Sequence, residues 1–90
     1  MRDNVMIIDR RDNVGVALRD LTAGEEVLCS GVEGLAATDA IPASHKVALR
    51  DIAAGEEIIK YGEVVGVSAQ EIGCGAWVHT HNLESDRWKK

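Results

Sequence analysis

The chain has 90 residues, which suffice for one domain and exclude a second. A hydrophobic content of 46% excludes a disordered chain, and an aromatic content of only 3% means that Val, Ile, Leu and Ala must form the core. The net charge of −5 argues against a nucleic-acid partner, and the lack of a long apolar run argues against a signal peptide or a membrane partner. A locally basic site for an anionic ligand stays open.

The predicted elements, in chain order, begin with an arm at residues 1–11, whose structure the sequence does not indicate. The expected domain covers residues 12–83, and a solvated tail follows at residues 84–90. Within the domain, short apolar and β-branched runs alternate with glycine-containing turns, which is typical of an all-β fold. The expected strands are VGVAL (14–18), EEVL (25–28), KVAL (46–49), EEII (56–59), VVGV (64–67) and AWVHTHNL (76–83).

One stretch departs from this alternation. Residues 31–45, GVEGLAATDAIPASH, are rich in alanine and contain the only proline of the chain, Pro42. A residue that precedes proline avoids the α region of backbone space. We therefore expect a connecting loop here, with at most one helical turn.

Thirteen residues of the chain occur twice in nearly the same order. VALRDLTAGEEVL (16–28) and VALRDIAAGEEII (47–59) share nine identical positions at an offset of 31 residues. Two copies are too few for a solenoid, so the repeat predicts a compact, pseudo-symmetric β domain. The duplicated pairs Arg19-Asp20 and Arg50-Asp51 are interpreted as ion pairs or turn contacts of that fold, and not as catalytic residues.

Each copy contains the pattern aliphatic-x-x-Gly-x-x-aliphatic, and residues 72–78, IGCGAWV, contain it a third time. Glycine adopts a positive φ without a steric cost, so it reverses the chain between a core residue and the next strand. Gly24, Gly55 and Gly75 are therefore predicted to occupy equivalent turns.

The two cysteines, Cys29 and Cys74, lie 45 residues apart and form no CxxC motif. So short a chain would need more cysteines for a disulfide framework, which predicts free thiols in a reducing cytoplasm. Structural zinc bound by these cysteines and the histidines is a weaker hypothesis, because the paired spacing of zinc sites is absent.

Three segments of the chain carry a resemblance to a known family. DNVGVALRDLTAGEEV (12–27), IPASHKVALRDIAAGEEIIKYGEVVG (41–66) and IGCGAWVHTHNL (72–83) resemble the SAF domain of the altronate and galactarate dehydratase family. The resemblance implies a β-clip fold, which is a small, folded-over set of short strands. It also implies the dehydration of a sugar acid, or the related cleavage of sulfolactate to pyruvate and sulfite.

The resemblance further implies how the chain is assembled. In the dehydratases the SAF domain is fused to a large catalytic domain, whereas in sulfolactate sulfo-lyase it is a separate small subunit. A chain that ends shortly after the HTHNL motif is similar to the separate subunit. We therefore expect a large catalytic subunit as partner. Homo-oligomerisation also stays open, because so short a chain buries a small share of its surface.

The implied reaction is an α,β-elimination from a small anionic hydroxy acid. A base must remove the α-proton, and a metal or a cationic group must stabilise the enediolate that develops. The leaving group is either water or sulfite. A chain of 90 residues with so few titratable candidates for catalysis cannot easily hold all these groups, so the active site is expected at the junction with the large subunit. A divalent metal (Fe, Mn or Mg) is expected in the full complex.

His79 and His81 are the first candidates for this site. Residues i and i+2 of a strand share a face, so both imidazoles are expected to converge on one metal ion or one anionic ligand. Imidazole suits first-row metals such as Fe, Mn or Zn and titrates near neutral pH. The alternative is a packing pair or surface histidines without a function.

The other candidates are His45, Lys46, Lys60 and Asn82. His45 is expected to join the two other histidines as a catalytic group, while Lys46, Lys60 and Asn82 are candidates for binding the substrate. For the two lysines a solvated position is an equally valid interpretation. A second function also stays open, in which the chain is a non-catalytic SAF binding module or a lid that stabilises a partner protein.

Overall fold

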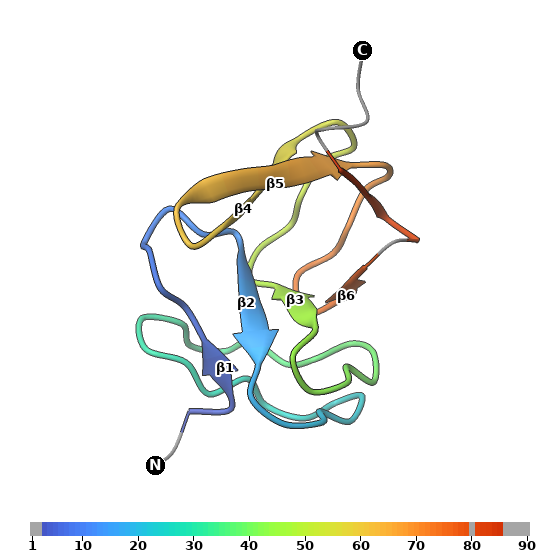
Figure 1. The fold of residues 1–90 in the computed structure, drawn as a ribbon. Helices are drawn as coiled ribbons and strands as arrows, with labels where there is room; N and C mark the ends of the chain where they lie inside the picture. Colours follow the sequence, from blue (N-terminus) through green and yellow to red (C-terminus); the bar gives the residue numbers. More distant parts are fainter. Residues whose placement is uncertain (1–2, 80, 86–90) are drawn as a thin grey trace.

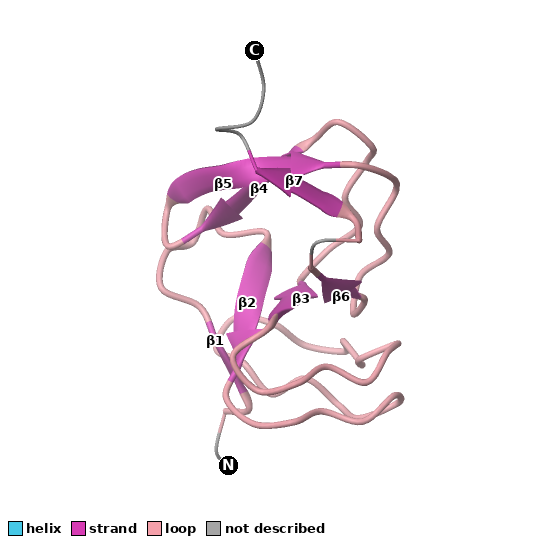
Figure 2. Ribbon diagram, turned by 45° about the vertical axis from the view of Figure 1, so that its right-hand side comes forward, coloured by secondary structure: helices cyan, strands magenta, loops and turns pink. Residues whose placement is uncertain are grey.

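The computed structural model describes residues 3–79 and 81–85. Over these residues the chain is all-β and contains no helix, which confirms the predicted fold class (Figures 1 and 2). In the same part of the chain, no helix is long and apolar enough to cross a membrane. The described residues form seven strands: β1 (Val5–Met6), β2 (Val14–Ala17), β3 (Lys46–Ala48), β4 (Glu57–Lys60), β5 (Glu63–Ser68), β6 (Trp77–Val78) and β7 (Leu83–Ser85).

The strands form two small antiparallel sheets. The first has the order β1-β2-β3-β6 and the second the order β4-β5-β7. Figure 1 shows the β4–β5 hairpin lying across the end of the first sheet at which β2 begins. This folded-over arrangement agrees with the small β-clip domain that the resemblance implies.

Two clusters of aliphatic side chains form the core. Successive residues of a strand point to opposite faces, and β3 accordingly places Val47 in one cluster and Ala48 in the other. The predicted aliphatic composition of the core is confirmed. The first cluster contains Val5, Ala17, Leu21, Val27, Cys29, Leu35, Ala37, Ile41 and Val47, and the second contains Val14, Ala48, Ile52, Ile58, Ile72 and Val78.

The glycine turns of the repeat are equivalent in the structure, as predicted. In each turn the fifth residue donates its backbone N–H to the carbonyl of the second residue, and the residue at the glycine position has a positive φ. A fourth copy, which the sequence analysis missed, lies in the 31–45 stretch and places Ser44 at the glycine position. The values of φ are 89° at Gly24, 73° at Ser44, 84° at Gly55 and 87° at Gly75. The closing hydrogen bonds are Glu25–Thr22, His45–Pro42, Glu56–Ala53 and Ala76–Gly73, at 3.0–3.1 Å.

The four turns form two pairs. Leu21 exchanges both backbone hydrogen bonds with Ile41, and Ile52 does the same with Ile72, at 2.8–2.9 Å. Leu21 and Ile52 are 31 residues apart in the sequence, and so are Ile41 and Ile72. The 31-residue repeat therefore covers two turns per copy and extends beyond the thirteen matching letters.

The duplicated charged residues serve this architecture, as the sequence predicted. Arg19 pairs with Glu25, and Arg50 pairs with Glu56 in the equivalent position. The aspartates also have equivalent partners. Asp20 accepts a hydrogen bond from the backbone N–H of Ala43 at 2.8 Å, and Asp51 accepts one from that of Cys74 at 2.9 Å.

Two of the turn glycines are expected to tolerate a methyl group very differently. A Cβ on Gly55 would meet no atom within 4 Å, so Gly55→Ala should cost only the strain of the positive φ, about 1–2 kcal/mol. A Cβ on Gly75 would collide with the carbonyl oxygen of Ala36. Gly75→Ala is therefore expected to lower the free energy of unfolding by a further 1–3 kcal/mol or so. Urea denaturation of both variants checks this difference, and equal losses would contradict it.

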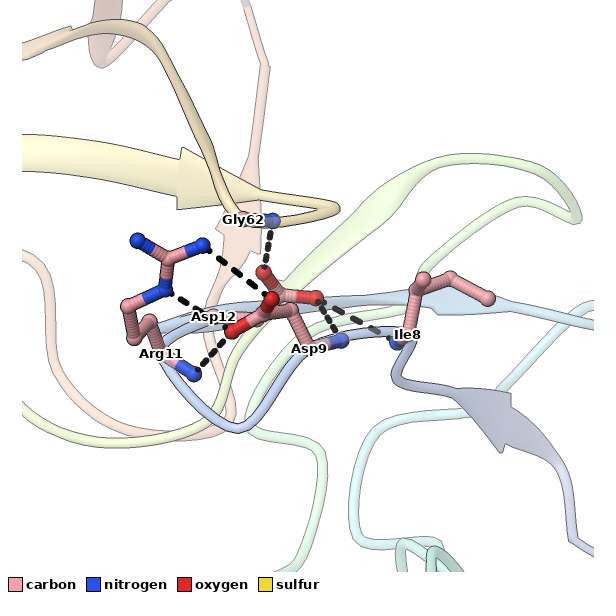
Figure 3. A network of polar contacts seen from close by, with 5 residues as sticks. All are labelled: Ile8, Asp9, Arg11, Asp12 and Gly62. Atoms are coloured by element: carbon pink, nitrogen blue, oxygen red, sulfur yellow. Dashed lines mark hydrogen bonds and ion pairs between the residues drawn. The ribbon is translucent and has the colours of Figure 1, made fainter.

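The N-terminal segment, which the sequence set apart as an arm, contributes a strand and an anchored loop. Asp12 is 9% exposed, and its carboxylate accepts backbone N–H groups of Ile8, Asp9 and Gly62 (Figure 3). The bond from Gly62, at 2.7 Å, ties the loop to the β4–β5 turn. Beside it, hydrogen bonds from Arg11 lower the pKa of Asp9 to about 2. Of the predicted tail, residues 86–90 lie outside the described part of the chain.

All three asparagines of the chain are buried and clamp backbone in the same way. Each side chain donates to a carbonyl and accepts from an N–H two residues further along the same strand or loop, so that it spans one core residue. The three spanned residues, Val27, Ile58 and Val78, occupy the same position in three of the turn copies. Asn4 binds Glu26 O and Leu28 N, Asn13 binds Glu57 O and Ile59 N, and Asn82 binds Trp77 O and His79 N.

Candidate functional site

The register of two strands brings His45 and His79 together. β3 and β6 are antiparallel, with Lys46 opposite Val78 and Val47 opposite Trp77. His45 directly precedes β3 and His79 directly follows β6, so both imidazoles lie at the same end of this strand pair. Their ring centroids are 4.6 Å apart.

Trp77 stands at the centre of this group. Its ring is stacked on that of His79, with an interplanar angle of 7° and a centroid distance of 5.4 Å. The rings of His45 and His81 lie 5.6 and 5.3 Å from it. The indole N–H of Trp77 also donates a hydrogen bond to Nδ1 of His45 at 3.1 Å. We call these four residues the histidine patch.

The predicted reason for the convergence of His79 and His81 was wrong. Strand β6 ends at Val78, and the backbone N–H groups of Asn82 and Leu83 both donate to the carbonyl of His79, at 3.0 and 2.9 Å. The two histidines therefore belong to a turn and not to one face of a strand. They gather because each contacts Trp77. The sequence analysis missed Trp77. The signal that could have found it is the rarity of aromatic residues, since the chain has two tryptophans, one tyrosine and no phenylalanine.

The patch is open to solvent. His81 is exposed, while His45, Trp77 and His79 are half-buried. Loss of hydration lowers the pKa of His79, and the positive charges of His45, Lys46 and His81 lower it further. His79 therefore keeps a neutral imidazole, which can accept a proton, to lower pH than an isolated histidine does.

The two candidate lysines add positive charge. Lys46, on β3, is half-buried, and burial together with the charge of Lys60 lowers its pKa. Lys60 ends β4, and its ammonium lies 4.9 Å from the centre of the Tyr61 ring. The ion pairs within residues 3–79 and 81–85 involve neither lysine. Both cations are thus available to an anion in this part of an otherwise acidic chain.

Asn82 lies beneath the patch rather than in it. Its side chain is only 3% exposed, and both ends of its amide bind the backbone of Trp77 and His79, at 2.8 and 2.9 Å. In this position Asn82 holds the turn that presents the histidines. Its predicted contact with the substrate stays a prediction.

The described residues do not form a shell for a metal ion. Within them, no group of three or more His, Cys, Asp or Glu side chains is placed to hold one. Nδ1 of His45 is engaged by Trp77, and the rings of His79 and His81 both contact the same indole. The metal that was expected of His79 and His81 in the full complex stays a prediction.

Comparison with known proteins identifies relatives over nearly the whole chain. Residues 3–86 match the family described as altronate/galactarate dehydratase SAF domain. The chain is 38% identical over 79 residues to an altronate dehydratase of Bacillus subtilis, which covers 88% of this chain but 16% of that protein. The chain therefore spans about a sixth of the length of that relative.

A second kind of relative is matched over most or all of its own length. The chain is 35% identical over 94 residues to the (2R)-sulfolactate sulfo-lyase subunit alpha of Chromohalobacter salexigens, covering 98% of this chain and 100% of that protein. The subunit of that name from Paracoccus pantotrophus is 44% identical over 54 residues, which cover 60% of this chain and 81% of that protein.

Proposed function

This chain belongs to the family of the altronate/galactarate dehydratase SAF domain, and from that premise we propose that it is the SAF component of a lyase. The lyase removes water or sulfite from a small anionic hydroxy acid by α,β-elimination. This chain contributes the histidine patch to an active site that a larger catalytic subunit completes. The observation that carries the proposal is the gathering of three imidazoles, with Lys46 close to His79, in an acidic chain. Within residues 3–79 and 81–85, no ion pair involves Lys46 or Lys60.

The patch supplies groups that an elimination needs. Lys46 and Lys60 attract the carboxylate or sulfonate of the substrate, because neither is neutralised within the described residues. The lowered pKa of His79 favours its neutral form, which can accept the α-proton as a general base. His81 is exposed and can reach a leaving group that a bound substrate presents. His45, the third predicted catalytic residue, contacts His79 and completes the group.

The openness of the patch supports a partner. Elimination through a carbanion-like state requires exclusion of bulk water and fixed charges around the substrate. An exposed His81 and a half-buried Trp77 provide only one wall of such a site. The relative that this chain matches over its full length is named subunit alpha, a name that indicates an enzyme with more than one subunit. We expect this enzyme in the cytoplasm, where Cys29 and Cys74, both free thiols, stay reduced.

Reconstitution tests the proposal. The purified chain alone, the large subunit alone, and the mixture of the two are each assayed on sulfolactate, altronate and galactarate. We expect no turnover by the chain alone and turnover of one substrate by the mixture. Turnover by the isolated chain would contradict the shared site. Full activity of the large subunit without this chain would favour a lid or binding module instead.

A further inference from the structure

The turn that holds His45 differs at its fifth position from the turns that hold Glu25 and Glu56. In those copies the fifth residue is a glutamate that closes its own turn, since Glu56 accepts the backbone N–H of Ala53 at 2.9 Å and Glu25 makes the equivalent bond. In the turn that holds His45, Pro42 stands at the position of that donor. Proline has no N–H, so a glutamate at position 45 would have nothing to accept. His45 is free to face another partner.

That partner is the indole of Trp77, at 3.1 Å from Nδ1 of His45. An indole nitrogen is a hydrogen-bond donor only, so Nδ1 must carry a lone pair and no proton. A neutral imidazole then carries its proton on Nε2. The contact thus selects one of the two neutral tautomers of His45.

Trp77 is itself held from several sides. Its backbone N–H donates to Oδ2 of Asp39 at 3.0 Å, and its carbonyl accepts the side-chain amide of Asn82 at 2.8 Å. Its ring is stacked on His79. The backbone of Trp77 is therefore anchored and its ring packs on His79, so contacts other than the one to His45 help to position the indole donor.

We infer that Trp77 is a positioning residue that fixes His45 as the Nε2–H tautomer. Nδ1 is closed by the indole, so His45 presents an N–H donor to whatever binds over the patch, and it is not the base. A neutral donor at this place suits the enediolate oxygen, on which charge develops in the transition state. The tautomer follows from the geometry alone, whereas the donor role toward a substrate rests on the proposed function.

Nuclear magnetic resonance of the ¹⁵N-labelled full chain tests the tautomer without any activity. The chain has three histidines, and single histidine-to-glutamine variants assign their imidazole signals. In alkaline buffer, where free imidazole is neutral, we expect His45 to carry its proton on Nε2 and to show scalar coupling from Nδ1 to the Trp77 indole nitrogen. Trp77→Phe keeps an aromatic ring on His79 but removes the donor, so the Nδ1–H tautomer of His45 should become detectable.

The matched control, Tyr61→Phe, removes an aromatic hydrogen-bond donor from an exposed position between β4 and β5, and it should leave the His45 tautomers as in the unchanged chain. A proton on Nδ1 of His45 in the unchanged chain would overturn the inference. So would identical tautomer mixtures with and without Trp77, or an equal change in the control.

Kinetics of the reconstituted enzyme test the donor role separately. Losing the fixed orientation of one hydrogen bond should lower kcat roughly twofold to tenfold in Trp77→Phe, with KM nearly unchanged. Unchanged kcat, or a change in KM alone, would overturn the donor role. If the unchanged complex shows no turnover at all, the proposed function fails, while the resonance experiment still decides the tautomer.

Discussion

Replacing Asn13 by alanine is expected to lower the free energy of unfolding by roughly 2–6 kcal/mol, which is a large part of the roughly 5–13 kcal/mol available to a domain of this size. The side chain is fully buried and binds Glu57 O at 2.8 Å and Ile59 N at 2.7 Å. Asn13 immediately precedes β2, whereas its two partners lie on β4. The side chain therefore joins the two sheets, and alanine would leave the carbonyl of Glu57 and the N–H of Ile59, in a partly buried region, without these partners.

Thermal unfolding followed by circular dichroism checks this expectation. Each kcal/mol corresponds to about 4–8 °C in Tm for a small domain, so the loss should be at least roughly 10 °C. Gln70→Ala removes an exposed side-chain amide and serves as the matched control, with a change of less than about 0.5 kcal/mol. A Tm for Asn13→Ala within a few degrees of the control would show that water replaces the clamp.

His81→Ala is expected to leave the fold nearly intact and to remove most activity of the reconstituted complex. His81 is exposed, and its described ring contact is with Trp77 at 5.3 Å, so its truncation loses little packing. If it transfers a proton to or from the leaving group, kcat should fall at least about a hundredfold. Turnover and urea denaturation of the same preparations separate the two effects.

The control for His81→Ala is Glu71→Ala, which truncates another exposed side chain, on the segment before Ile72. This variant should keep both stability and turnover. The assignment of His81 would be wrong if His81→Ala unfolded the domain while the folded fraction kept full activity, because the histidine would then be structural.

The repeat predicted much of the fold because its letters have direct physical consequences. Glycine at a reversing position and an aliphatic residue on each side suffice to specify a turn between core positions, and Gly24 and Gly55 indeed occupy equivalent turns. The interpretation of the duplicated arginines and aspartates was also confirmed, since a feature that is copied with the fold usually serves the fold.

Other parts of the fold left weaker signals. The turn that begins at Ile41 was missed because it has Ser44 in place of glycine. Ser44 nevertheless adopts the positive φ, 73°, that the turn requires. The strand β1 was missed although DNV occurs both at residues 3–5 and at residues 12–14. Asn4 and Asn13 mark these two positions, and the role of their amides depends on strands far along the chain. Such long-range partners are not visible in local patterns.

For the candidate site, the sequence indicated which residues to consider better than it indicated how they are arranged. His45, His79 and the two lysines were chosen from residue types and from the resemblance, and the structure brings His45 next to His79 through the register of β3 and β6. The strand geometry expected for His79 and His81 was wrong, because β6 ends at Val78. Trp77 was overlooked, since an aromatic residue in an apolar run reads first as a core residue.

The measurement that most directly tests a shared active site is chemical modification of the histidines with diethyl pyrocarbonate, which reacts with neutral imidazole. Mass spectrometry gives the rates at His45, His79 and His81 in the chain alone, in the complex and in the complex with substrate. We expect fast reaction of His81 in the chain alone, strong protection of His79 and His81 with partner and substrate, and a loss of turnover that parallels their modification. Equal rates in all three states, together with full turnover by the modified complex, would contradict the account.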